Sequence, residues 1–164
     1  MSGKKPRRVR WHPTPDTFAL AMYHAAKPAR SDIQEILDGL AQAHKAMREG
    51  VATDMEWSIL SGALDIALFI ERQGAVRGLI EHLASTEPVL QAIYDRANQP
   101  GGWVAPVLHF YELDIINAFV ALHSFQIKSL SRAELVKAIR SATGLINSQG
   151  GKVTFARNIE EVAA

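Results

Sequence analysis

Signals that start and stop helices recur along this chain, and they constrain its fold more than any other feature. In a capping box, Ser or Thr is followed three residues later by Glu or Gln, and the two side chains cap the first turn of a helix. The sequence has this pattern at Ser31, Thr53 and Ser131. Gly50 and Gly74 follow the first two, and glycine is the preferred residue just past a helix end. The pattern predicts an all-α fold.

The predicted helices account for most of the sequence between residues 14 and 149. A Thr-Pro pair at 14–15 marks the start of the first helix, because proline suits the first helical position. The turn-forming string NQPGGW at 98–103 separates the fourth helix from the fifth. The predicted helices cover residues 16–26, 31–50, 53–74, 75–97, 105–128 and 131–147.

The sequence makes a further prediction for two of these helices, those at 75–97 and 53–74. Pro88 lies inside the segment 75–97. A proline within a helix removes a hydrogen bond and costs about 3 kcal/mol, so we predict a break or a kink near Ser85, whose hydroxyl can cap the helix where it restarts. The helix at 53–74 has few polar residues, which favours a central position in the fold.

Length and composition fit one compact domain. The chain has 164 residues, of which 48% are hydrophobic, and this is enough apolar material for a core. We find no internal repeat and no second domain. The sequence predicts a compact bundle of five to seven helices over residues 14–149. A flexible basic arm is predicted at 1–13 and a C-terminal tail at 150–164.

The amino-terminal arm carries the basic character of the chain. Residues 1–15 hold five basic residues and no acidic one, whereas the remainder holds 13 basic and 17 acidic residues. Such an arm is either a solubilising terminus or a weak nucleic-acid handle that combines phosphate attraction with one aromatic ring for stacking. The candidate nucleic-acid-binding residues are Lys4, Lys5, Arg7, Arg8, Arg10 and Trp11.

Several classes of protein are excluded by composition. The chain has no cysteine, which excludes disulfides, thiolate metal sites and a cysteine nucleophile. No apolar segment follows the first basic residues, so we expect no signal peptide. The apolar stretch 107–127 is long enough to cross a bilayer, but it contains Glu112 and Asp114, and we predict no membrane helix. We therefore expect a cytoplasmic protein.

The segment 109–126 is the most apolar long stretch, yet it contains a polar stripe. At about 100° per residue, His109, Glu112, His123 and Gln126 share one face of a helix, with two apolar residues between them. We call these four residues the polar stripe. Its ends are expected to be solvated and its middle buried.

Three interpretations of the polar stripe stay open. It is a set of hydrogen-bonded structural groups, or a face toward a partner chain, or a metal or acid–base site centred on His109 and Glu112. His109 and His123 are separated by about 21 Å along a helix, at about 1.5 Å per residue, so they cannot bind one ion together. No Glu-x-x-His or His-Glu-x-x-His motif is present. We assign no metal site.

Other signals of catalysis are weak. The sequence has no Gly-x-Ser-x-Gly, no phosphate-binding glycine-rich loop and no Gly-x-Gly-x-x-Gly. The Gly-Gly-Trp string at 101–103 indicates a turn followed by an anchoring indole. Aromatic residues inside apolar helices are expected in the core, and these are Trp57, Phe69, Phe110, Phe119 and Phe125. No catalytic residue and no cofactor is assigned.

The order of several short motifs resembles a set of small helical proteins encoded by phages, prophages and other mobile elements of proteobacteria. The motifs are the GVAT string at 50–53 followed by Trp57 and an apolar helix, the GGW turn at 101–103, and Glu112 followed by LHSFQ at 122–126. The resemblance covers roughly residues 1–140. It implies a mobile-element accessory protein of the bacterial cytoplasm, and it transfers no catalytic role.

These observations favour a non-enzymatic accessory protein that acts by binding another protein, encoded by the host or by the element. The first alternative is a nucleic-acid-associated factor that uses the basic arm. The second is a metal-dependent or acid–base enzyme at His109 and Glu112. The sequence is also compatible with a homo-oligomer, and whether the polar stripe is buried, interfacial or exposed is left to the structure.

Overall fold

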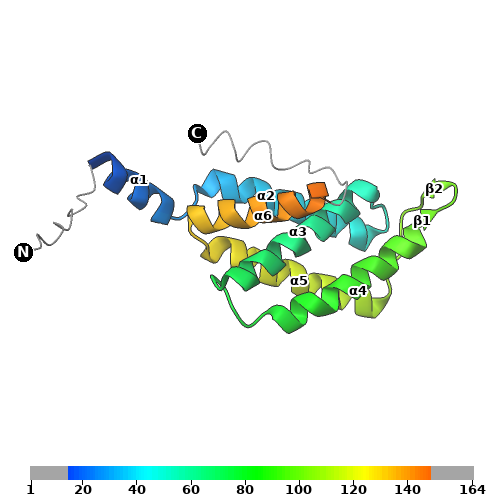
Figure 1. The fold of residues 1–164 in the computed structure, drawn as a ribbon. Helices are drawn as coiled ribbons and strands as arrows, with labels where there is room; N and C mark the ends of the chain where they lie inside the picture. Colours follow the sequence, from blue (N-terminus) through cyan, green and yellow to red (C-terminus); the bar gives the residue numbers. More distant parts are fainter. Residues whose placement is uncertain (1–14, 149–164) are drawn as a thin grey trace, which may run out of the picture.

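The computed structural model describes residues 15–148, and these residues form an all-helical fold with one short hairpin (Figure 1). The basic arm at 1–13 and the tail at 150–164 lie outside the described residues. The helices are α1 (Pro15–Ala25), α2 (Arg30–Glu49), α3 (Asp54–Gln73), α4 (Ile80–Ala97), α5 (Phe110–Ser129) and α6 (Arg132–Ser148). The hairpin strands are β1 (Asn98–Gln99) and β2 (Gly102–Trp103).

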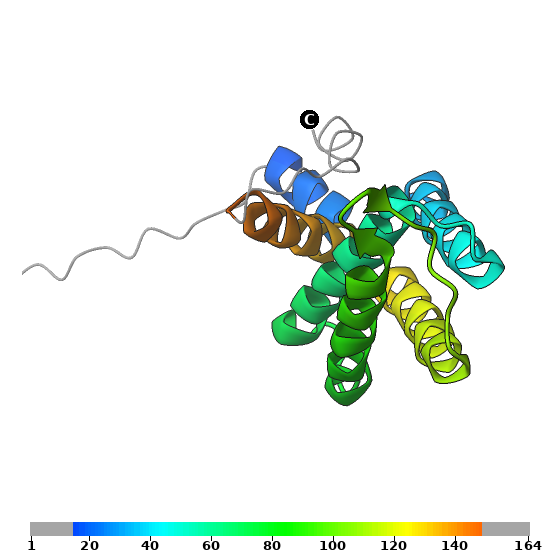
Figure 2. The same cartoon turned by 90° about the vertical axis from the view of Figure 1, so that its right-hand side faces the viewer.

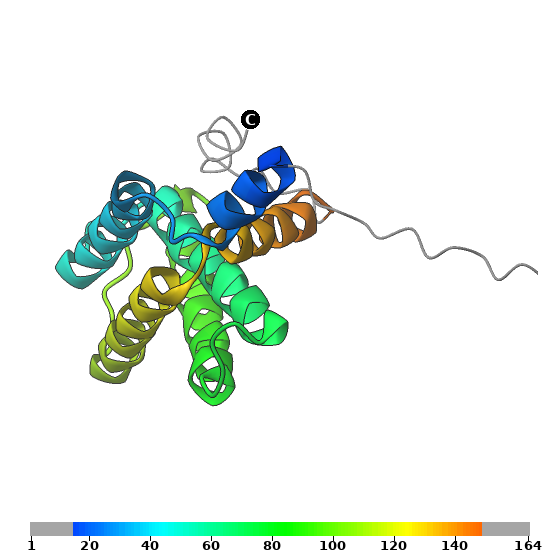
Figure 3. The ribbon, with the colours of Figure 1, turned by 90° about the vertical axis from the view of Figure 1, so that its left-hand side faces the viewer.

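The central element is α3, as its shortage of polar residues predicted. It contacts α2, α4, α5 and α6, which surround it in the end-on views (Figures 2 and 3). By contrast, α5 packs against α2, α3 and α4 with one face and exposes the other. The most apolar stretch of the sequence is therefore an outer helix of the fold.

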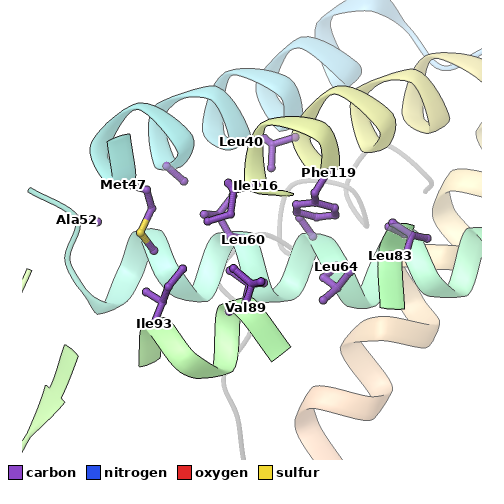
Figure 4. Close-up of a cluster of buried hydrophobic side chains, with 14 residues drawn as sticks. Leu40, Met47, Ala52, Leu60, Leu64, Leu83, Val89, Ile93, Ile116 and Phe119 are labelled. Carbon is purple, nitrogen blue, oxygen red and sulfur yellow. The ribbon is translucent and has the colours of Figure 1, made fainter. Parts of the chain in front are cut away.

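Two clusters of buried side chains form the core. The larger cluster joins α2, α3, α4 and α5, and its side chains converge between these helices (Figure 4). Phe119 and Leu60 are among its fully buried members. The smaller cluster joins α3 to α6 and includes Ile70 and Leu135. Among the side chains of α1 whose burial is described, residues 19–25, none belongs to either cluster.

Local capping signals set several helix ends as the sequence predicted. At the start of α3, the Thr53 hydroxyl accepts from the Met55 N–H and the Glu56 carboxylate accepts from the Thr53 N–H at 2.7 Å. Ser131 caps α6 in the same manner. Gly50 ends α2 in the left-handed region, with φ of 68°.

The capping box predicted at Ser31 is wrong. Instead, α2 begins at Arg30, with Ala29 as an extended N-cap residue that makes no side-chain capping bond. The N-cap residue therefore lies two positions before Ser31, directly after the buried Pro28. Ser31 therefore lies within the first turn, where its hydroxyl donates to the Asp32 carboxylate at 3.2 Å.

Glycine substitutions are expected to have opposite effects at Gly50 and Gly62. Gly50→Ala should lower the free energy of unfolding by about 1 kcal/mol, because alanine is strained at its φ of 68°. Gly62→Ala should raise it by about 0.5–1 kcal/mol, since Gly62 lies inside α3 and an added methyl group meets nothing within 4 Å. Urea unfolding of both variants measures the two changes in the free energy of unfolding. If both variants gain or both lose stability, the backbone conformations assigned to Gly50 and Gly62 are contradicted.

Of the break or kink predicted near Ser85, the break is wrong. The helix α4 continues through Pro88, and the Ser85 hydroxyl donates back to the His82 carbonyl at 2.8 Å without capping a new helix. Buried residues on both sides of the proline hold α4 against the core, and this packing outweighs the missing bond. The helical structure is instead interrupted at residues 74–79, between α3 and α4. The Glu71 carboxylate of α3 accepts from the Gly78 N–H of this segment at 2.7 Å.

The NQPGGW string forms a tight antiparallel hairpin, with Asn98 paired to Trp103. Gly102 takes a φ of 114°, which only glycine adopts easily. The Trp103 indole N–H donates to the Ala52 carbonyl at 2.9 Å, so the predicted anchoring indole is confirmed. The chain then runs without helical structure to His109, and α5 begins later than the Ala-Pro pair at 105–106 suggested.

Arg132, the first residue of α6, holds the C-terminal half of α1. Its guanidinium lies 4.3 Å from the centre of the Tyr23 ring and donates to the Tyr23 hydroxyl. Its backbone N–H donates to the Ala26 carbonyl at 2.9 Å. The same guanidinium lies 4.0 Å from the Asp32 carboxylate. These contacts attach α1 beside α6 (Figure 3).

Candidate functional site

Glu112 of the polar stripe is fully buried in a bidentate ion pair. It lies in the first turn of α5, and the Arg96 guanidinium in the last turn of α4 donates to both of its carboxylate oxygens at 2.7 Å. The backbone N–H of His109 donates to the same carboxylate at 2.8 Å, and the Tyr111 hydroxyl lies 3.4 Å from it. The carboxylate therefore joins two helices and caps one of them.

This environment keeps Glu112 charged. Burial acts to raise the pKa of its carboxyl group, but the hydrogen bonds from Arg96 and from the His109 N–H outweigh burial and hold the pKa below its ordinary value. A carboxylate in this state is a poor proton acceptor at neutral pH.

His109 and Glu112, the centre of the predicted metal or acid–base site, lie in different environments. It is the extended N-cap residue of α5, and its backbone rather than its ring contacts Glu112. The exposed His109 ring stacks on Tyr111, with ring centres 5.9 Å apart and planes 5° from parallel. Within residues 15–148, no group of three or more His, Asp or Glu residues is placed to hold a metal ion.

The other half of the polar stripe forms a buried hydrogen-bonded chain. The Nδ1 atom of His123 lies 3.1 Å from the Gln126 Oε1, and the Gln126 amide donates to the Ala67 carbonyl of α3 at 3.3 Å. The His123 ring also stacks on Phe119, with ring centres 5.8 Å apart. Complete burial lowers the pKa of His123 to about 4, although the bond to Gln126 opposes this.

Most of the polar stripe is buried and hydrogen-bonded. Glu112, His123 and Gln126 are buried, and only His109 is exposed. The end of the polar stripe at His109 is therefore solvated as expected, whereas the end at Gln126 is buried and that part of the expectation is wrong. The buried groups are bonded to Arg96 and to the Ala67 carbonyl. Hydrogen-bonded groups of this kind tie α5 to α3 and α4 and are structural.

Two aromatic residues predicted in the core are exposed. Phe110 is 81% exposed and Phe125 is also on the surface. At about 100° per residue, both lie about 140–160° from Glu112 around α5, on the side that faces away from the polar stripe. Helical spacing alone gives these angles, whereas the prediction of a core position followed from the usual burial of aromatic rings.

An exposed apolar surface lies at the end of the molecule where α5 begins. It combines the segment before α5 with the connection between α2 and α3, which run past each other in Figure 2. A methyl group added to Gly50 would lie 4.0 Å from the Val107 side chain, so the two segments are in contact. Val107 is 80% exposed. We call this region the apolar surface, and it consists of Val51, Val104, Val107, Phe110 and Tyr111.

Sequence reasoning found neither this surface nor Arg96. The signal for the surface was the dense run of large apolar residues at 104–111 beside a proline, which does not fit a buried helix face. Arg96 gave no comparable signal, because its partner lies in another helix and no sequence spacing encodes the pair. The candidate residues of the basic arm, from Lys4 to Trp11, lie outside the described residues.

Comparisons with protein-family models, with curated proteins and with solved structures find no match to this chain. The resemblance to proteins of mobile elements therefore stays a prediction. None of the helices α1 to α6 is long and apolar enough to cross a membrane.

Proposed function

We propose that this chain is a non-enzymatic accessory protein, of the kind carried by phages and other mobile elements, that acts by binding another protein through the apolar surface. The observation that carries the proposal is the exposure of Phe110 and Val107 at the end of the fold where the turn at Gly50 comes close to Val107. Contiguous exposed apolar residues that include aromatic rings are typical of protein-binding surfaces.

The polar stripe supports a binding role over a catalytic one. Catalysis by Glu112 or His123 needs a side chain that is free to reach a substrate. The Glu112 carboxylate is fully buried and engaged by Arg96, and the His123 ring is buried against Phe119. Glu112, His123 and Gln126 of α5 are therefore used to hold the fold, and the exposed residues at its start include the large apolar side chains of Phe110 and Tyr111.

The double substitution Val107→Ser and Phe110→Ser is expected to abolish partner binding while leaving the fold intact. Both side chains are exposed, so the free energy of unfolding should change by less than about 0.5 kcal/mol. The measurement is affinity capture from a bacterial lysate on the immobilised full chain, with the retained proteins quantified by mass spectrometry. Proteins retained by the wild type should be lost with the double variant.

Phe125→Ser is the matched control, because Phe125 is an exposed phenylalanine of the same helix outside the apolar surface. It should retain the same proteins as the wild type. Equal retention by the wild type and the double variant would rule out the apolar surface as the binding site.

A further inference from the structure

The helix α1 is largely apolar, and its described side chains are exposed. Every described side chain from Ala19 to Lys27 is on the surface, and Leu20 and Met22 are 56% and 58% exposed. At about 100° per residue these two side chains lie about 160° apart around the helix. Large apolar side chains on two sides of a helix are normally covered by other elements or by a partner. The contacts with Arg132 reach Tyr23 and Ala26 at the C-terminal end, whereas Leu20 and Met22 stay exposed.

Charge identifies what can cover α1. Residues 1–31 hold seven basic residues and one acidic residue, whereas the remaining residues hold 11 basic and 16 acidic residues. Two copies of α1 packed against each other would bring two strongly basic segments together, and like charges oppose that arrangement. The acidic remainder of a second copy has the opposite sign and attracts the basic segment.

The apolar surface has the properties that such a partner needs. It is another exposed apolar region among the described residues, and exposed carboxylates lie next to it in the sequence at Glu49, Asp54 and Asp114. Two basic residues, Lys45 and Arg48, are also exposed nearby, so the local balance is acidic by one charge. An apolar region bordered by an excess of carboxylates complements an apolar helix bordered by basic residues.

The two regions lie at opposite ends of the molecule. In Figure 1, α1 extends from one end, and the hairpin and the start of α5 lie at the other. A contact between different surfaces of two identical chains leaves one copy of each surface free on the resulting dimer. Further copies can therefore add at both ends.

We propose that copies of this chain associate head to tail, with α1 of one copy docked on the apolar surface of the next and the basic arm directed toward acidic residues of that copy. This inference rests on the proposed function, because it names the partner of the same apolar surface. High salt weakens the association, since exposed charges contribute to the contact.

The test uses one variant for each surface. The α1 variant carries Leu20→Ser and Met22→Ser, and the apolar-surface variant carries Val107→Ser and Phe110→Ser. Analytical ultracentrifugation of the full chain from 5 to 200 µM gives the average mass at low and high salt. The wild type should grow beyond a dimer with rising concentration, and each variant alone should associate at least tenfold more weakly. An equimolar mixture of the two variants should form a 1:1 dimer that does not grow, because each retains one intact surface.

One control variant and two contrary outcomes complete the test. Ile80→Ser removes an exposed apolar side chain from α4, outside both surfaces, and should associate like the wild type. A monomeric wild type at 200 µM, or a mixture of variants that stays monomeric, would overturn the head-to-tail contact. The proposed function fails separately, through the lysate capture, if proteins other than this chain are retained equally by the wild type and the apolar-surface variant.

Discussion

Arg96→Ala is expected to lower the free energy of unfolding by about 3–5 kcal/mol, which is the usual cost of removing one partner from a buried ion pair. The substitution leaves the Glu112 carboxylate fully buried, with the His109 N–H as its main remaining donor. Glu112→Gln should cost less, because the Arg96 side chain is 36% exposed and water can solvate its guanidinium. Urea unfolding at pH 7 measures both changes.

The pH dependence of the Arg96→Ala effect distinguishes a lost ion pair from a simple packing defect. In the wild type, the pKa of Glu112 lies below its unfolded value, so its contribution to stability is present above that value and is lost as pH falls through the folded pKa. Without Arg96, burial loses its main opposing influence, so we expect the pKa of Glu112 to rise above its unfolded value. Protonation at lower pH then relieves the variant, and the gap to the wild type should narrow between pH 7 and about pH 4.5.

The exposed ion pair of Lys45 and Glu49 provides the matched control. Its charged atoms lie 3.8 Å apart and both side chains are more than half exposed. Lys45→Ala should cost at most about 0.5 kcal/mol, because solvent and salt screen an exposed pair. A loss for Arg96→Ala as small as this, or a gap to the wild type that is constant with pH, would contradict the role assigned to the buried pair.

The parts of the fold that could be predicted from the sequence are those that are encoded locally. The Thr53 capping box and the glycine at position 50 act within one helical turn, and both helix ends lie where these signals place them. Pro88 misled the prediction because its cost is local while the packing that holds α4 together comes from other helices. The start of α5 was missed because His109, rather than Ser or Thr, precedes the Glu112 that completes the cap.

The candidate site was predictable to a similar extent. Helical spacing placed Glu112, His123 and Gln126 on one face, and the structure buries that face. Spacing cannot show what the face meets, because the Arg96 guanidinium and the Ala67 carbonyl come from other helices. The exposed Phe110 follows from the same helical geometry, but only once the buried face of α5 has been chosen.

The stability of the protein is expected to fall by about 2 kcal/mol between pH 7.5 and pH 5 because of His123 alone. Burial holds its folded pKa at about 4, whereas an unfolded histidine titrates near 6.5. Between these two values the unfolded chain binds a proton that the folded chain does not, so stability rises with pH in this window and is lost as pH falls. Urea unfolding at half-unit pH steps measures the slope.

His123→Phe should remove this slope, because phenylalanine keeps a ring beside Phe119 and has no proton to bind. The variant also deprives the Gln126 Oε1 of its ring partner, so its stability at pH 7.5 should be lower than that of the wild type. Leu60→Ala is the control for lower stability as such, since it creates a cavity in the same core and should cost about 2–5 kcal/mol with the wild-type slope. If the stability of His123→Phe and that of Leu60→Ala depend on pH in the same way, burial does not hold His123 neutral. In that case the hydrogen-bonded chain from His123 through Gln126 to Ala67 does not connect α5 to α3 in a water-free interior, contrary to what its geometry indicates.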